Sequence, residues 1–328
     1  MKREYSFDIL RVISMIMVII VHVSNVYSRS FGFISNSSFI FSLIFNTISR
    51  ISVPIFLMIS GALLLDRKFD FKKYKKRIIK FLILIIVWDI IYLVWEYYYL
   101  HISYDKLYNL LFNPYRAHLW FLYTILLLYL IQPVLRKILI KSNIQVKVLL
   151  LTLWILFSTG SMIFKPLAQY FTFFSYMGFF IIGKYLYDYI KKNDLSKYNI
   201  LLILTILVSI TLSVVLNYKT SIKYNMFYNL YFAYRTPFII LSSFAFYTLI
   251  ITNYKKDSLN KIIQKLSDLS LGVYLIHGIF LDITIKTFVY QSINSLIGIP
   301  IFTILIFIAS VISTYILSKI KYIKTIIQ

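Results

Sequence analysis

Two ionisable residues, Arg11 and His22, stand inside the first long apolar segment of the chain. They are eleven positions apart. On an ideal helix, eleven steps return to within about 20° of the starting direction and climb ~16 Å. Asp8, three residues before Arg11, lies on the same face and can pair with the guanidinium. Because ionisable groups inside a bilayer are costly, we interpret them first as functional groups.

The residue types suit acid–base work on a phosphate-bearing molecule. A buried histidine titrates near neutrality and suits a general base, and a fixed arginine suits phosphate binding. The eight basic residues between 66 and 80 favour the same interpretation. The alternatives are structural: Arg11 can snorkel to the membrane interface, His22 can satisfy a backbone carbonyl, and the basic loop can report topology or contact anionic membrane lipid.

Several other chemistries have no support in the chain. Cysteine is absent, which removes disulfides, thiolate metal sites and a cysteine nucleophile. The four histidines, at positions 22, 101, 118 and 277, are scattered and form no metal-binding motif. The eight glycines form no phosphate loop or dinucleotide fingerprint, and no Gly-x-Ser-x-Gly occurs. We therefore predict no bound metal and no permanently bound cofactor.

Composition indicates the kind of element that must position these residues. Hydrophobic residues make up 60 % of the 328 positions and charged residues only 14 %, against roughly 25 % in soluble domains. The net charge of +23 could suggest nucleic acid, but such binding domains do not hold this much apolar sequence. The sequence predicts an all-α, polytopic membrane protein that does not bind nucleic acid.

Ten apolar runs are long enough to cross a bilayer, which needs about 20 residues. They lie at 9–28, 39–65, 79–100, 119–140, 146–164, 171–190, 199–217, 229–252, 269–290 and 296–318. The second run contains Pro54, near which we expect a kink or a tilt.

Orientation follows from the basic residues. One set of loops and the two termini hold 25 Lys and Arg, while the alternate loops hold six. The positive-inside rule therefore places both termini in the cytoplasm. No loop is long enough to fold separately, so residues 1–328 are predicted to form one membrane domain.

Five motifs occur in order on these spans. They are Phe7–Arg11 followed by ten residues and His22, Arg50–Gly61 with its Ser60-Gly61 pair, His118–Tyr123, Gly178–Leu186, and Ser270–His277. Together they resemble the acyltransferase 3 family of integral membrane proteins, over most of the chain. The chain ends at Gln328, so it resembles the stand-alone type without an appended hydrolase-like domain.

The resemblance implies an activity. Members transfer an acyl group, usually acetyl from acetyl-CoA, to a hydroxyl of a cell-surface carbohydrate or lipid-linked glycan. Acyl-CoA would be a co-substrate from the cytoplasm, and the protein would be a multi-pass protein of the cell membrane. The transfer could be direct, with His22 as general base, or could pass through a covalent acyl-histidine.

The resemblance also ranks the residues. His22 and Arg11, supported by Asp8, are the first catalytic candidates. Arg50 and the Ser60-Gly61 pair come second, and Arg50 could bind acceptor charge, donor phosphate or a developing oxyanion.

Four more residues are binding candidates with structural alternatives. Trp120 could belong to an interfacial aromatic belt or stack on a sugar ring, and His118 beside it stays open. Arg235 could bind an anionic acceptor or snorkel outward. His277 enters the list through its motif.

Two further pairs of ionisable residues are harder to assign. Asp89 and Glu96 share one helix face and could be counter-ions of Arg50 or Arg11, or face a wet cavity. Asp282 and Lys286 are four residues apart and are predicted to pair with each other.

A transporter or exporter of a glycolipid or polysaccharide is the alternative function. The same buried charges could line its pathway. The chain shows no clear inverted repeat, which weighs mildly against this alternative.

Overall fold

The computed structural model describes residues 3–66, 68–101, 116–160, 162, 168–254, 260–321 and 327, with residues 168–172 described by their backbone. Every regular element within these ranges is helical, as predicted. The long helices are α1 (Tyr5–Arg29), α2 (Asn36–Ser49), α3 (Ser52–Leu64), α4 (Phe71–Trp95), α5 (Trp120–Lys141), α6 (Ile144–Gly160), α7 (Ala168–Lys192), α8 (Asn199–Tyr224), α9 (Pro237–Asn253), α10 (Lys261–Thr287) and α11 (Ser295–Leu317).

Short helical turns extend or join the long helices. They are the π-helical turn η1 (Glu96–Leu100) and the 3₁₀ turns η3 (Ala117–Leu119), η5 (Ser196–Tyr198), η6 (Leu230–Phe232) and η7 (Tyr290–Ser292). A π-helical turn of this kind widens the helix locally and frequently accompanies functional sites.

Each of the ten predicted spans overlaps a helix or, for the second span, the pair α2 and α3, with ends that differ by up to eight residues. Within the described residues, eight helical units are long and apolar enough to cross a membrane, so the chain is a multi-pass membrane protein. The other two predicted spans correspond to α6, a shorter apolar helix of 17 residues, and α7, which is not among the eight. The last residues of the run at 146–164 fall partly outside the described ranges. The cytoplasmic placement of the termini stays a prediction.

The second span breaks close to the position that Pro54 predicted. α2 ends at Ser49, α3 begins at Ser52, and Arg50 and Ile51 lie between them. Proline has no N–H to donate to the carbonyl four residues earlier, which here belongs to Arg50, so the helical ladder is interrupted there. The break places the side chain of Arg50 in the middle of a 29-residue span.

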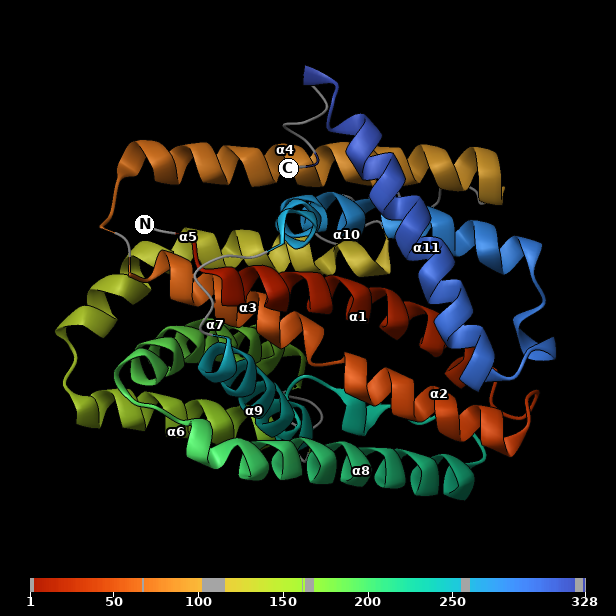
Figure 1. Ribbon diagram of the computed structural model, residues 1–328, viewed down its shortest axis with the longest axis horizontal. Coiled ribbons are helices and arrows are strands. Elements are labelled where there is room, and N and C mark those ends of the chain that lie inside the picture. The colour runs from red at the N-terminus through yellow and green to blue at the C-terminus, as the bar shows by residue number, and fades with distance from the viewer. Residues whose placement is uncertain are drawn as a thin grey trace.

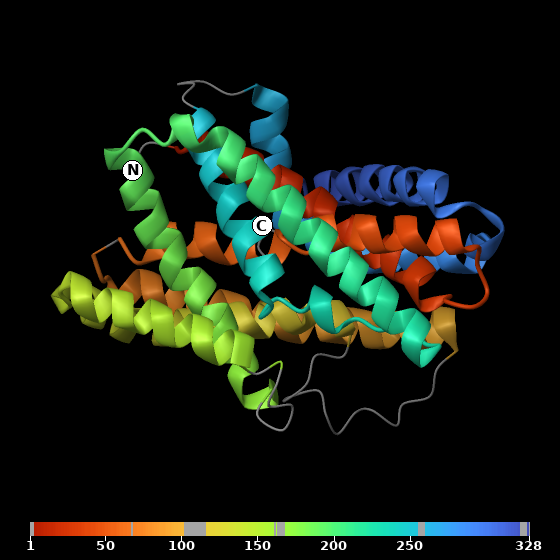
Figure 2. The ribbon, with the colours of Figure 1, turned by 90° about the horizontal axis from the view of Figure 1, so that it is seen from below.

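The broken span lies at the centre of the bundle. Of its most apolar window 72 % is buried, against 28 % for α4 and 17 % for α8. Figure 1 shows α4 and α8 at opposite edges with α1 and α3 between them, and Figure 2 shows α8 lying across the face opposite α4. The residues inside α1 and α3 are therefore shielded by protein, whereas α4 and α8 expose apolar surface that suits lipid.

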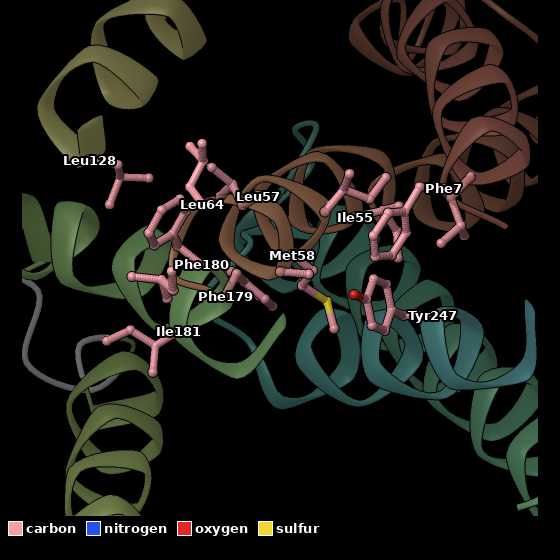
Figure 3. Packing of buried hydrophobic residues seen from close by; sticks show 14 of the residues in the cluster. Phe7, Ile55, Leu57, Met58, Leu64, Leu128, Phe179, Phe180, Ile181 and Tyr247 are labelled. Carbon is pink, nitrogen blue, oxygen red and sulfur yellow. The ribbon is translucent and has the colours of Figure 1, made fainter. Parts of the chain in front are cut away.

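α3 and α7 pack face to face in the main core (Figure 3). Phe179 and Phe180 of α7 lie against Leu57 and Met58 of α3, and all four are fully buried. Tyr247 of α9 joins them and donates a hydrogen bond to a carbonyl of α7.

Two glycines allow this close approach. A Cβ at Gly61 would overlap the carbonyl oxygen of Phe180, and one at Gly183 would overlap the backbone of Met58. Small residues at such crossings let two helix backbones touch, which is how helices pack tightly in membranes. The backbone of α3, including the Arg50 break, is thereby fixed against α7.

We expect Gly61→Ala to lower the free energy of unfolding by about 1–3 kcal/mol, because α3 and α7 must separate to admit the methyl group. Thermal unfolding of the purified protein in detergent would measure the loss. Gly160→Ala is the matched control, since no atom lies near a Cβ at that position. An unchanged unfolding midpoint for Gly61→Ala would contradict the packing argument.

Candidate active site

A cavity of about 570 Å³ opens between α1, the α2–α3 break, α5 and α7. We call it the His22 cavity. Its wall includes His22, Arg50, His118, Trp120 and Tyr234. All of these except Tyr234 are candidate site residues from the sequence analysis, and they come from segments far apart in the chain.

A second cavity of about 140 Å³ lies toward the N-terminal end of α1. We call it the Arg11 cavity. Arg11, Ser60 and Tyr129 line it, and the same three residues line a recess of about 280 Å³ that also contains Arg77. The guanidinium groups of Arg11 and Arg77 thus both line this recess.

The two cavities adjoin at an apolar waist. Val18, Val53, Phe121 and Tyr274 line both of them. α1 supplies Arg11, Val18 and His22 at intervals of seven and four residues, so one face of one helix follows the space from end to end. The predicted common face of Arg11 and His22 is confirmed as a matter of geometry.

Asp8 holds Arg11 in place. Its carboxylate accepts hydrogen bonds from Arg11 Nη1 at 3.1 Å, Arg3 Nε at 2.6 Å and Ser267 Oγ at 2.8 Å. The Asp8 side chain is only 1 % exposed, so these hydrogen bonds are shielded from solvent. The predicted Asp8–Arg11 pair is confirmed, and the structure adds Arg3 and Ser267 to it. Asp8 is therefore a positioning residue for Arg11.

Three of the four histidines converge beside the His22 cavity. The ring centroids of His22 and His277 are 5.1 Å apart, those of His277 and His118 5.0 Å, and those of His22 and His118 6.1 Å. Only His101, at the end of η1, lies away from the group. The sequence does not predict this convergence, because the separations between the histidines in the chain match no known motif.

His118 and His277 each have one buried ring nitrogen without a hydrogen-bond partner among the described residues. His277 Nδ1 lies 2.5 Å from the carbonyl of Tyr274, which fixes its N–H there and leaves Nε2 as an acceptor. Nε2 of His277 and Nε2 of His118 are buried with no hydrogen-bond partner among the described residues. Across the described ranges, no group of three or more His, Cys, Asp or Glu residues is arranged to hold a metal ion.

An ion-pair cluster that the sequence did not reveal supports His118. Arg116 Nη1 binds Glu96 at 2.8 Å, and its Nη2 binds Asp282, which also accepts a hydrogen bond from Trp95 at 3.0 Å. The guanidinium lies over the ring of Tyr92.

That ring in turn lies edge-on to His118, with centroids 4.8 Å apart. The hydroxyl of Tyr274 donates to the His118 carbonyl. The only signal of this arrangement in the sequence is that Arg116 stands two residues before His118.

The prediction that Asp282 pairs with Lys286 is wrong, and of the alternatives left open for Asp89 and Glu96, the structure does not show them as counter-ions of Arg50 or Arg11. Asp282 pairs with Arg116, and Lys286 donates instead to the carbonyl of Tyr99. Glu96 also serves Arg116, and Asp89 accepts a hydrogen bond from Tyr123 at 2.5 Å. Helical spacing identified shared faces but not the partner across the bundle, which belongs to another helix.

The other candidate site residues from the sequence analysis lie in several parts of the structure. Ser60 lines the Arg11 cavity, whereas Gly61 faces the α7 backbone. Trp120 lines the His22 cavity and stacks on Tyr176 with centroids 4.9 Å apart, so it faces the cavity. Arg235 precedes α9, and its Nε is buried with no hydrogen-bond partner among the described residues.

Comparison with protein-family models matches residues 4–319 to the acyltransferase 3 model, which is described as an acyltransferase domain. The match covers nearly the whole chain, so the chain belongs to the acyltransferase 3 family and is a membrane acyltransferase. The same comparisons found no match among curated proteins and none among solved structures.

We expect Arg116→Gln to cost about 3–5 kcal/mol of unfolding free energy, because it leaves two largely buried carboxylates unpaired. Thermal unfolding would measure the loss, and adding Glu96→Gln and Asp282→Asn should recover part of it. The control is Lys73→Gln, which breaks an exposed pair with Asp70 and should cost less than about 1 kcal/mol. Equal losses for the two single variants would contradict this assignment.

Proposed function

We propose that the protein is an O-acyltransferase of the cell's cytoplasmic membrane. It moves an acyl group, acetyl in the first instance, from acyl-CoA to a hydroxyl of a cell-surface or lipid-linked glycan. The observation that supports this most directly is the pair of adjoining cavities on one face of α1, with Arg11 in one and His22 in the other.

The Arg11 end suits the donor. Arg11 and Arg77 flank a recess close to the basic residues at the start of α4, and guanidinium groups bind phosphate bidentately. The predicted topology places this end in the cytoplasm, where acyl-CoA is found. The nucleotide is too highly charged to cross the bilayer, but its uncharged pantetheine arm can extend toward the waist.

The waist brings the thioester to the histidine while limiting water. Val18, Val53 and Phe121 present apolar side chains, so a bound pantetheine arm would fill the constriction. Water excluded from the waist cannot hydrolyse the thioester in competition with transfer.

The chemical step is a direct displacement in the His22 cavity. The acceptor hydroxyl gives its proton to His22 while its oxygen bonds to the thioester carbonyl carbon. The carbon–sulfur bond then breaks, and the proton passes from the imidazolium to the departing CoA thiolate. Ester and free CoA are the products. A direct base role needs fewer steps than a covalent acyl-histidine.

We expect His22→Asn to lower acetyl transfer by about 10²–10⁴-fold, the usual contribution of a general base. Radiolabelled acetyl-CoA and membranes containing the protein would measure incorporation into glycan. His101→Asn is the matched control, because His101 is exposed, and asparagine tolerates its left-handed backbone conformation. Wild-type turnover by His22→Asn at normal protein level would remove the assigned base.

The same assay separates the transporter alternative. A transporter neither consumes the thioester nor gains thermal stability from CoA, whereas the proposed enzyme does both. Loss of the signal on His22→Asn then ties consumption of acetyl-CoA to this site.

We expect Arg11→Gln to raise the KM for acetyl-CoA about tenfold or more, with a smaller change in kcat, because the guanidinium contacts the donor far from the reacting carbon. Asp8→Asn should shift KM in the same direction by less, since it only loosens Arg11. Steady-state kinetics at saturating acceptor would measure both. A pure loss of kcat with unchanged KM would place Arg11 at the chemical step instead.

A further inference from the structure

Arg50 faces the His22 cavity, and no counter-ion for it lies within the part of the chain that the structure describes. Its Nε donates to Asn46 Oδ1 at 2.9 Å, and Asn46 Nδ2 reaches the carbonyl of Val21, the residue before His22, at 3.5 Å. Among the described residues, no carboxylate pairs with Arg50, and the guanidinium lies instead 5.8 Å from the ring centroids of Phe232 and Tyr234. Asn46 thus aims the guanidinium and links its position to that of His22.

Two other half-buried arginines near the cavities have carboxylate partners among the described residues. Arg11 has Asp8, and Arg116 has Glu96 and Asp282. A cation that faces a largely apolar cavity is costly unless an anion accompanies it. The missing partner of Arg50 is therefore expected in the space that Arg50 lines.

A second polar group in the same wall lacks a partner. Ser52, two residues after Arg50, is fully buried and lines the His22 cavity, and its Oγ has no hydrogen-bond partner among the described residues. A buried hydroxyl without an acceptor costs free energy that a ligand oxygen would offset. Arg50 and Ser52 together present several N–H and O–H donors to one region of the cavity.

Another part of the cavity wall is apolar and is formed by three aromatic rings. Trp120 stacks on Tyr176, and Tyr234 lies 5.8 Å from Trp120 and 5.9 Å from Tyr176 by ring centroids. All three rings line the His22 cavity. Flat aromatic surfaces receive the C–H face of a sugar ring, because both surfaces are apolar and extended.

We propose that the acceptor glycan carries a permanent anionic group, which Arg50 and Ser52 bind while the sugar ring lies against Trp120 and its neighbours. The bound ring then presents its hydroxyl to His22. A developing oxyanion exists only in the transition state, whereas an unpaired cation is present in the resting protein, so a permanent anion matches it better. This inference rests on the proposed function and names its acceptor class.

The anion could come from two sources with the same chemistry. One is the carboxylate of an acidic sugar, and the other is a phosphodiester that links the sugars of a polymer or joins a glycan to its lipid. Both present paired oxygens to a guanidinium. The probes in the experiment separate them.

The experiment is equilibrium binding to the purified protein without acyl-CoA. Three probes are methyl glucuronide, the glycerol phosphodiester of glucose and neutral methyl glucoside. The wild type should bind at least one anionic probe about tenfold or more tightly than the neutral one. The anionic probe that binds more tightly identifies the source of the charge.

Variants test the assignment. Arg50→Gln should bring the ratio of anionic to neutral affinity close to one, and Arg50→Lys should retain part of the ratio. Ser52→Ala should reduce it less than Arg50→Gln does. Arg29→Gln, which removes an exposed arginine at the end of α1, is the matched control and should leave the ratio unchanged.

Three results would overturn the inference. They are equal wild-type affinities for all probes, no binding of either anionic probe, and an unchanged ratio in both Arg50 variants. His22→Asn separates this inference from the acyl-transfer proposal, because it should lose turnover and keep the binding ratio. Charge preference without any consumption of acetyl-CoA would keep the anion site and reject the enzyme.

Discussion

The structure depends on one constraint: ionisable side chains in a membrane must face protein or an internal cavity, never lipid. α1 satisfies it by placing Arg11, Val18 and His22 on a single face that the rest of the bundle covers. α2, α3, α10 and α11 pack against this helix.

The broken second span gives the same interior a second cation. A continuous helix would pair its backbone N–H and C=O groups within itself. The break between α2 and α3 instead leaves Arg50 between the two helices. Pro54 interrupts the ladder, and the contacts of α3 with α7 at Gly61 and Gly183 fix the second half. Arg50 is consequently held beside His22 by a hydrogen bond from Asn46 to α1. The close packing of α3 on α7 thus serves the position of one guanidinium.

Local sequence rules predicted the helical spans and pairs within one helix, but they did not predict which residues pair between segments that are distant in the chain. The spans, the kink before Pro54 and the Asp8–Arg11 pair follow from hydropathy, proline chemistry and helical spacing, which act over a few residues. The Asp282–Lys286 prediction failed by the same logic, because Arg116, 166 positions away, is a closer and better partner. Spacing within a helix says which residues share a face but not which helix that face meets.

The sequence by itself determined the class of protein, the helical spans and the polar face of α1, because bilayer thickness and helix geometry depend only on the local order of residues. The resemblance of its ordered motifs to one family was confirmed over residues 4–319. Only the tertiary structure decided that His118 and His277 join His22, that Arg116 has carboxylate partners, and that Arg50 has none among the residues that the structure describes. Those facts depend on which helices pack together, and that packing is fixed by contacts between separate segments of the chain, such as those of His22 and His277, 255 residues apart.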